Sequence, residues 1–162
     1  MGEAKLTIEE LIAAARGEVL VALSEEAEAA VNKAREVVEK CVSEDKVVYG
    51  LTTGFGKFSD VTISEEDTLA LQENLIMSHA CGVGEPLPDE VVRAMMLLRI
   101  NALSVGFSGI RVSTIKTLIE MLNKGVIPVV PSKGSLGASG DLVPLAHMSL
   151  VLLGMGEAKY KG

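Results

Sequence analysis

The sequence predicts a mainly helical fold with a few short strands, and three observations support this prediction. Apolar residues make up 48% of the 162 residues but aromatic residues only 3%, so small and aliphatic side chains must fill the interior, which suits helices better than β-sandwiches. Apolar residues recur at the helical period, most clearly over 27–42. Glycine-rich stretches without periodicity separate such segments. A chain of this length can bury one substantial core.

In the first half of the chain, capping residues mark where helices begin. Thr7 and Glu10 have the spacing of a capping box, and Ser24 stands before the periodic segment. The elements predicted here are a short helix through Ala15, a strand over 18–23, a long helix after Ser24, a brief extended piece over 47–49, and a helix that begins at Ser64 and runs to about His79.

In the second half, proline and glycine mark the helix ends. Pro88 suits the first position of a helix, and Gly125 ends another. The predicted helices run from Pro88 to about Ser104, from about Val112 to Lys124, and from Asp141 to about Leu153. Two glycine-rich loops lie between the helices, GLTTGFGKFSD over 50–60 and GSLGASG over 134–140.

Composition argues against several classes of protein. The net charge of -7 and the lack of any basic run argue against nucleic-acid binding. Cys41 and Cys81 predict neither a disulfide framework nor a zinc site, and His79 and His147 lack the spacing of metal ligands. The start of the chain has charge where a signal peptide is apolar, and the apolar stretch 142–155 is too interrupted to span a bilayer. We therefore expect a cytoplasmic protein that binds no metal, nucleic acid or membrane.

Two common catalytic motifs are present only in part. The stretch 137–140 resembles the nucleophile elbow of serine hydrolases, but Asp141 replaces its last glycine, and His147 lies on the same predicted helix. The Gly56-Lys57 pair lacks the flanking residues of a phosphate-binding loop.

Four segments, in order, carry a more specific resemblance. They are YGLTTGFG at 49–56, SHACGVGEPL at 78–87, NALSVGFSGIR at 101–111 and GSLGASGDLVPLAH at 134–147. Together they resemble the aromatic amino acid ammonia-lyases and aminomutases, over essentially the whole chain. Within that family, the segments around 107–111 and 145–148 look more like histidine ammonia-lyases than like aminomutases.

The resemblance implies a fold and an assembly. It implies the amino-terminal part of the aromatic amino acid lyase fold, with a mixed, mostly helical domain over 1–109 that includes a lid-like loop at 50–60. Residues 110–162 would begin a long helical bundle, most of which is absent from this sequence, and would contain the cofactor-forming loop 134–141. Members of the family are longer, form tetramers with shared active sites, and supply further site residues downstream. We therefore expect either a fragment or one subunit of a split enzyme with a separate C-terminal partner, inactive by itself.

The resemblance also implies a cofactor made from the chain. In such proteins the amide nitrogen corresponding to Gly140 attacks the carbonyl corresponding to Ala138, two waters leave, and Ser139 becomes a methylidene group. The product is a methylidene-imidazolone (MIO), and no external cofactor is needed. The competing interpretation is that Ser139 or Asp141 merely caps the helix that follows.

The resemblance also implies roles for two further residues. Tyr49 corresponds to the catalytic base and His79 to the residue that contacts the substrate imidazole, whereas His147 is expected to be structural. The implied reaction is deamination of L-histidine to trans-urocanate and ammonia. Because tyrosine-specific relatives can share a histidine at the position of His79, a tyrosine or phenylalanine ammonia-lyase or aminomutase remains an alternative. A non-catalytic assembly subunit is another.

Overall fold

The computed structural model describes residues 6–44, 46–53, 65–138 and 140–161, and this part of the chain is mainly helical, as predicted. Its helices are α1 (Ile8–Ala15), α2 (Glu25–Ser43), α3 (Glu65–His79), α4 (Asp89–Ser104), α5 (Val112–Lys124) and α6 (Leu142–Leu152). Its strands are β1 (Val83–Pro86), β2 (Val126–Pro128), β3 (Pro131–Lys133) and β4 (Ala158–Tyr160).

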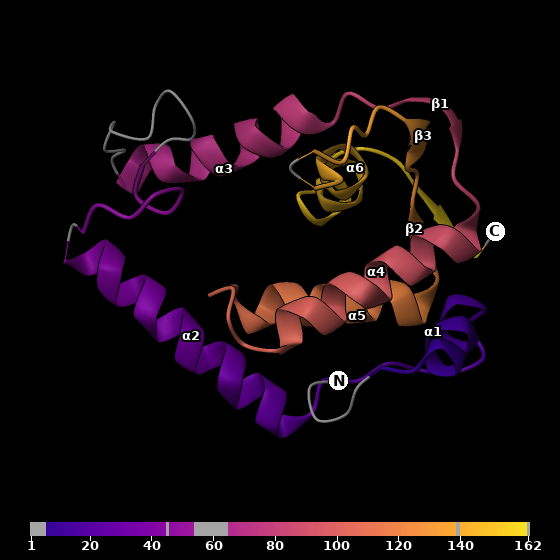
Figure 1. The fold of residues 1–162 in the computed structure, drawn as a ribbon, viewed down its shortest axis with the longest axis horizontal. Coiled ribbons are helices and arrows are strands. Elements are labelled where there is room, and N and C mark those ends of the chain that lie inside the picture. Colours follow the sequence, from indigo (N-terminus) through magenta and orange to yellow (C-terminus); the bar gives the residue numbers. More distant parts are fainter. Residues whose placement is uncertain (1–5, 45, 54–64, 139, 162) are drawn as a thin grey trace.

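Helices α4 and α5 lie side by side, and the other helices surround them (Figure 1). α1 packs against one end of α4, α2 contacts both central helices, and α6 packs between α5 and α3. The strands form two antiparallel pairs, β1 with β3 and β2 with β4. The pairing of β1 with β3 matters for the site, because it places the segment after α3 beside the segment that leads into α6.

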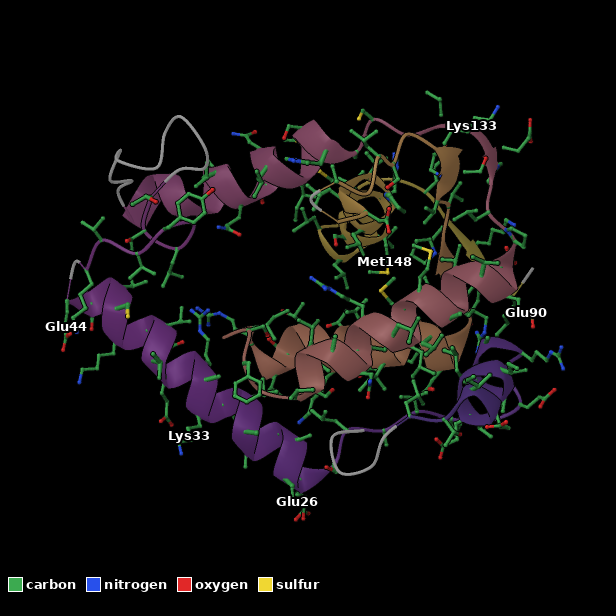
Figure 2. The ribbon with its side chains drawn as sticks, in the orientation of Figure 1. Glu26, Lys33, Glu44, Glu90, Lys133 and Met148 are labelled. Atoms are coloured by element: carbon green, nitrogen blue, oxygen red, sulfur yellow. The ribbon has the colours of Figure 1, made fainter. Side chains whose placement is uncertain are left out.

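The core is aliphatic, and α4 and α5 supply most of it. Met96 and Ile100 of α4 and Ile115 of α5 are fully buried. α6 contributes Met148, which is 2% exposed and lies between α6 and α4 in Figure 2. The outer face of α2 is charged, as Lys33 shows in the same view. Since dispersion contacts in such a core are numerous and non-directional, the core fixes the helices near one another without setting each polar contact.

The predicted helix boundaries agree closely with the structure. The capping box is present, because the Thr7 amide donates to the Glu10 carboxylate at 2.8 Å and the Glu10 amide donates to Thr7 Oγ1 at 3.2 Å. Gly125 ends α5 in the left-handed conformation, with φ 71°. One correction concerns Pro88, which precedes the first residue of α4 rather than occupying it.

The strand predicted over 18–23 is wrong. No strand neighbour pairs with this segment in the described part of the chain, and an amide side chain takes that role instead. Asn123 Oδ1 accepts from the Val21 amide at 2.9 Å, and Asn123 Nδ2 donates to the Val21 carbonyl at 2.8 Å. The apolar run therefore has its backbone bonded at one position without belonging to a sheet.

The short extended segments differ from their predictions. The extended piece over 47–49 forms no strand, and Tyr49 stands in a turn. The four short strands were not predicted at their positions, because three or four residues are too few to show a period of two. Most of the lid-like loop 50–60 lies outside the described residues, and the division at 109/110 stays a prediction. None of the helices described here is long and apolar enough to cross a membrane.

Candidate active site

The loop between β3 and α6 folds back on itself. Gly137 and Gly140 have φ values of 76° and 100°, a region that favours glycine. The Gly140 amide donates to the Gly137 carbonyl at 3.4 Å, and the Leu142 amide donates to the Gly140 carbonyl at 3.0 Å. Ala138 and Gly140 are exposed, and the predicted site residue Ser139 lies outside the described residues. The described residues on the two sides of Ser139 thus form a compact, glycine-dependent turn.

The start of α6 has no side-chain cap from Asp141. This residue stands at the N-cap position, but its side chain makes no capping hydrogen bond to the helix. Its carboxylate instead accepts from Ser135 Oγ at 2.5 Å, within the loop. The interpretation that the Asp141 side chain caps the helix is therefore wrong, whereas the same interpretation of Ser139 falls outside the described residues. The triplet directly precedes a helix amino terminus, where the helix dipole favours negative charge.

His79 ends α3 with a defined hydrogen bond. Its Nδ1 lies 2.8 Å from the Leu75 carbonyl oxygen and 3.1 Å from Ser78 Oγ. A carbonyl oxygen only accepts, so Nδ1 carries the hydrogen in this bond. In the neutral ring, Nε2 is then an acceptor. This leaves His79 able to receive a hydrogen bond from a donor group of a ligand.

His79 lines an apolar pocket of about 500 Å³ together with the first turns of α6. The lining residues come from α3, α4 and α6 and are mostly aliphatic, with three polar side chains among them. They are Leu75, Ile76, His79, Arg99, Leu142, Leu145, Ala146 and Ser149. Arg99 and Ser149 were missed by sequence reasoning, since nothing in their local sequence distinguishes them from ordinary helix residues. Leu142 begins α6 two residues after Gly140, so the pocket adjoins the triplet loop.

Tyr49 stands in a turn whose backbone is held by two threonines. Thr52 Oγ1 accepts from the Val48 amide at 2.9 Å, and Thr53 Oγ1 accepts from the Gly50 amide at 3.2 Å. Thr53 is 1% exposed, whereas Tyr49 is 64% exposed. The threonines therefore fix the chain on both sides of Tyr49 and leave most of the phenol ring accessible.

The structure brings two of the predicted site elements together and leaves one apart. His79 and the start of α6 share the pocket, but Tyr49 does not line it. In the view of Figure 1 the turn after α2 and helix α6 lie at opposite ends of α3, and His79 is the last residue of that helix. A helix of 15 residues is about 22 Å long, at about 1.5 Å per residue. Among the described residues, Tyr49 therefore lies apart from the pocket that adjoins the triplet loop.

His147 lies outside the pocket lining, as expected for a structural residue, but it has a specific partner. Its Nε2 accepts from the Gly82 amide at 2.9 Å. Burial lowers the pKa of His147 below its ordinary value, which favours the neutral ring that this bond requires. No local sequence pattern indicates this partner, which lies 65 residues away.

Comparisons with known proteins agree on one family. Residues 6–162 match the family model described as aromatic amino acid lyase. The chain is 66% identical over 157 residues to a histidine ammonia-lyase of Caldanaerobacter subterraneus subsp. tengcongensis, which covers 97% of this chain and 31% of that protein.

Two solved structures resemble the chain closely. A phenylalanine aminomutase of Pantoea agglomerans has a TM-score of 0.92 and 40% identity, over 99% of this chain and 31% of its own. A histidine ammonia-lyase of Trypanosoma cruzi has a TM-score of 0.88 and 39% identity, over 96% of this chain and 29% of its own. The chain thus spans about 31% of the length of the curated relative described above.

Proposed function

Because this chain belongs to the aromatic amino acid lyase family, we propose that it forms part of a histidine ammonia-lyase that converts L-histidine to trans-urocanate and ammonia. The complete lyase is this chain joined by the remaining part that its relatives contain. The observation that carries the proposal is the pocket shared by His79 and the first turns of α6, next to the triplet loop. The 66% identity to a histidine ammonia-lyase supports the same substrate.

His79 is the proposed contact for the substrate side chain. With its hydrogen on Nδ1, bonded to the Leu75 carbonyl, the ring offers Nε2 as an acceptor. The imidazole of histidine has an N–H group that can donate to it, whereas the ring of phenylalanine has none. A polar acceptor in a mostly aliphatic pocket therefore favours histidine, because binding phenylalanine would leave Nε2 without a partner.

Ala138, Ser139 and Gly140 are proposed to form the methylidene-imidazolone. The described part of the loop fits this group, because the chain already turns back tightly between Gly137 and Gly140, with Gly140 at φ 100°. When formed, the group supplies an electrophilic carbon for the amino acid substrate. The amino terminus of α6 follows directly, and its dipole would stabilise negative charge at this place.

Tyr49 is proposed as the base that takes the β-proton of the substrate. A phenol must be accessible and held in place to act as a base, and the threonine-braced turn meets both needs. Since Tyr49 does not line the pocket of its own chain, we propose that the active site combines parts of neighbouring chains, as in a tetramer.

The experiment uses the complete lyase and three variants. Ser139→Ala should abolish the mass loss of two waters and reduce histidine deamination by orders of magnitude, since the electrophile cannot form. Tyr49→Phe should lower turnover similarly while leaving the mass loss intact, because the phenol acts only on the substrate. Tyr160→Phe is a matched control outside the proposed site and should retain activity. Full activity in Ser139→Ala would refute the cofactor assignment.

One observation favours an alternative within the same chemistry. The high TM-score to a phenylalanine aminomutase means that the local fold is equally compatible with an aminomutase. Incubating the complete lyase with histidine, tyrosine and phenylalanine separates the alternatives. Release of ammonia with an unsaturated acid identifies a lyase, and a β-amino acid product identifies an aminomutase. Preference for tyrosine or phenylalanine would overturn the substrate assignment but not the cofactor.

A further inference from the structure

The segment that follows His79 is held between the two elements that flank the triplet loop. On one side, β1 pairs with β3, with Val83 opposite Lys133 and Pro86 opposite Pro131. On the other side, the Gly82 amide donates to His147 Nε2 of α6 at 2.9 Å. β3 leads into the triplet loop and α6 follows it, so both contacts reach the immediate flanks of the triplet.

The junction around Gly82 is closely packed. A Cβ atom added at Gly82 would lie 2.9 Å from His147 Nε2, 3.1 Å from Pro131 Cβ and 3.1 Å from Val143 Cγ1. A Cβ added at Gly134 would lie 3.2 Å from the Gly82 Cα atom. The space between Gly82, Pro131 and α6 therefore has no room for a side chain at residue 82.

We propose that His147 is a positioning residue, which fixes His79 relative to the triplet at residues 138–140. Elsewhere α3 packs on α6, and the side chains of Leu75 and Leu145 from these helices line the mostly apolar pocket. Apolar packing is non-directional and tolerates a small slide of one helix along another. The hydrogen bond at Gly82 is directional and sets a definite position three residues after His79.

His147 acts through other residues rather than on the substrate. It does not line the pocket, whereas its neighbours Leu145, Ala146 and Ser149 on α6 do. The Gly82 amide can only donate, so the contact requires an acceptor at the position of Nε2. Glutamine can place its Oε1 at a similar distance from the backbone, whereas leucine has similar bulk and no acceptor. These two substitutions therefore separate the hydrogen bond from the packing.

The inference rests on the proposed function and is tested in the complete lyase. His147→Leu should raise KM for histidine by about tenfold, because a small misplacement of a binding group is costly. The intact mass should still show the loss of two waters, since the triplet itself is unchanged. His147→Gln should keep KM within about threefold of the original by restoring the acceptor. A purely structural contact would lower thermal stability without this split between the variants.

The outcomes distinguish the inference from the proposed function. If the unmodified complete lyase neither deaminates histidine nor loses two waters, the proposed function fails. If it does both and His147→Leu folds with an unchanged KM, or His147→Gln behaves like the leucine variant, the positioning role is refuted. If His147→Leu does not fold, Gly82→Ala takes its place, because its added Cβ would press against His147 Nε2 and Val143 and so push residue 82 away from α6. Loss of folding in both would also overturn the proposal, in favour of a contact needed for the fold alone.

Discussion

At the scale of single residues, the two histidines of the chain form hydrogen bonds of opposite sense. His79 Nδ1 donates to the Leu75 carbonyl, whereas His147 Nε2 accepts from the Gly82 amide. The first arrangement leaves an acceptor for a ligand, and the second uses the acceptor internally. The same side chain type is thus proposed to bind substrate at one position and to hold the backbone at another.

His147 predicts a dependence of stability on pH. Burial lowers its pKa below the ordinary value of 6.5, which an unfolded chain would retain. As the pH falls below about 6.5, the unfolded state therefore binds a proton that the folded state does not, and the free energy of unfolding decreases. Urea unfolding of the complete lyase between pH 8 and pH 5.5 should show this decrease, and His147→Gln should reduce it.

The exposed carboxylates provide an internal check on that prediction. Hydrogen bonding to the Thr7 backbone lowers the pKa of Glu10 below its ordinary value of 4.5, and a hydrogen bond from Arg35 does the same for Glu39. Their contributions are lost only as the pH falls below about 4.5, outside the range of the test. An identical pH dependence in the original and His147→Gln proteins would contradict the assignment.

At the scale of elements, alanine substitutions at two glycines distinguish the cost of backbone strain from the cost of a steric clash. Gly106 and Gly125 have φ values of 82° and 71°, so alanine is strained at both, by about 1 kcal/mol. A Cβ at Gly106 would lie 2.8 Å from the carbonyl carbon of Ala30 in α2, whereas nothing lies within 4 Å at Gly125. We expect Gly106→Ala to lower the free energy of unfolding by about 1–3 kcal/mol more than Gly125→Ala.

Denaturant titration of both variants measures that difference directly. Equal losses would mean that the turn after α4 can move away from α2 at little cost. The expected difference would instead show that this turn is needed to seat α2 on the central helices.

The Asn123 side chain forms hydrogen bonds with both the amide and the carbonyl of Val21. Asn123→Ala should lower the free energy of unfolding by about 2 kcal/mol, because it leaves a partly buried amide and carbonyl without their side-chain partners. Asn123→Asp keeps the acceptor but loses the donor, so it should also destabilise. Lys124→Ala, which removes only an exposed ion pair with Glu120, is the control and should change stability by less than about 0.5 kcal/mol. A neutral Asn123→Ala would mean that water satisfies the segment equally well.

At the scale of the whole molecule, many large apolar side chains remain on the surface. Phe107 is 92% exposed, Leu136 is 90% exposed and Leu20 is 81% exposed. α6 is apolar along its length, yet Leu142 at its start is 44% exposed. Large apolar side chains are costly to leave in water, so further protein that covered them would stabilise the chain.

We therefore predict that the 162-residue chain alone self-associates, does not deaminate histidine and keeps the mass of its unmodified sequence. Closing the triplet ring requires a strained loop, and strain persists only where the surroundings enforce it. Ala138 and Gly140 are exposed in this chain, so little surrounds them here. Intact mass and sedimentation of the purified chain measure both points. A monomeric chain lighter by two waters would contradict the prediction and show that this part suffices to make the group.

Mixing this chain with the remaining part of the lyase tests the alternative that the chain is a non-catalytic assembly subunit. Recovery of activity only with intact Ser139 and Tyr49 would exclude that view. Activity that is unaffected by changing either residue would support it.

The sequence by itself determined most of the helices and the family. Capping residues such as Thr7 and terminating residues such as Gly125 act within a few positions of the helix ends, so local sequence suffices to place them. The ordered segments around Tyr49, His79 and the triplet are equally local, and they identified a family that the comparisons confirmed.

Only the tertiary structure decided which distant groups meet. The backbone of Val21 pairs with a side chain 102 residues away, so an apolar run that resembles a strand forms none. The Gly82 amide bonds to His147, 65 residues away. β1 pairs with β3, although these strands of four and three residues are too short to show an alternating apolar pattern. Hydrogen-bond donors and acceptors are present at almost every residue, so their sequence positions do not reveal their partners. The packing of the helices against one another selects those partners. The arrangement of α3, α4 and α6 also determines that His79 shares a pocket with the start of α6 while Tyr49 does not line it.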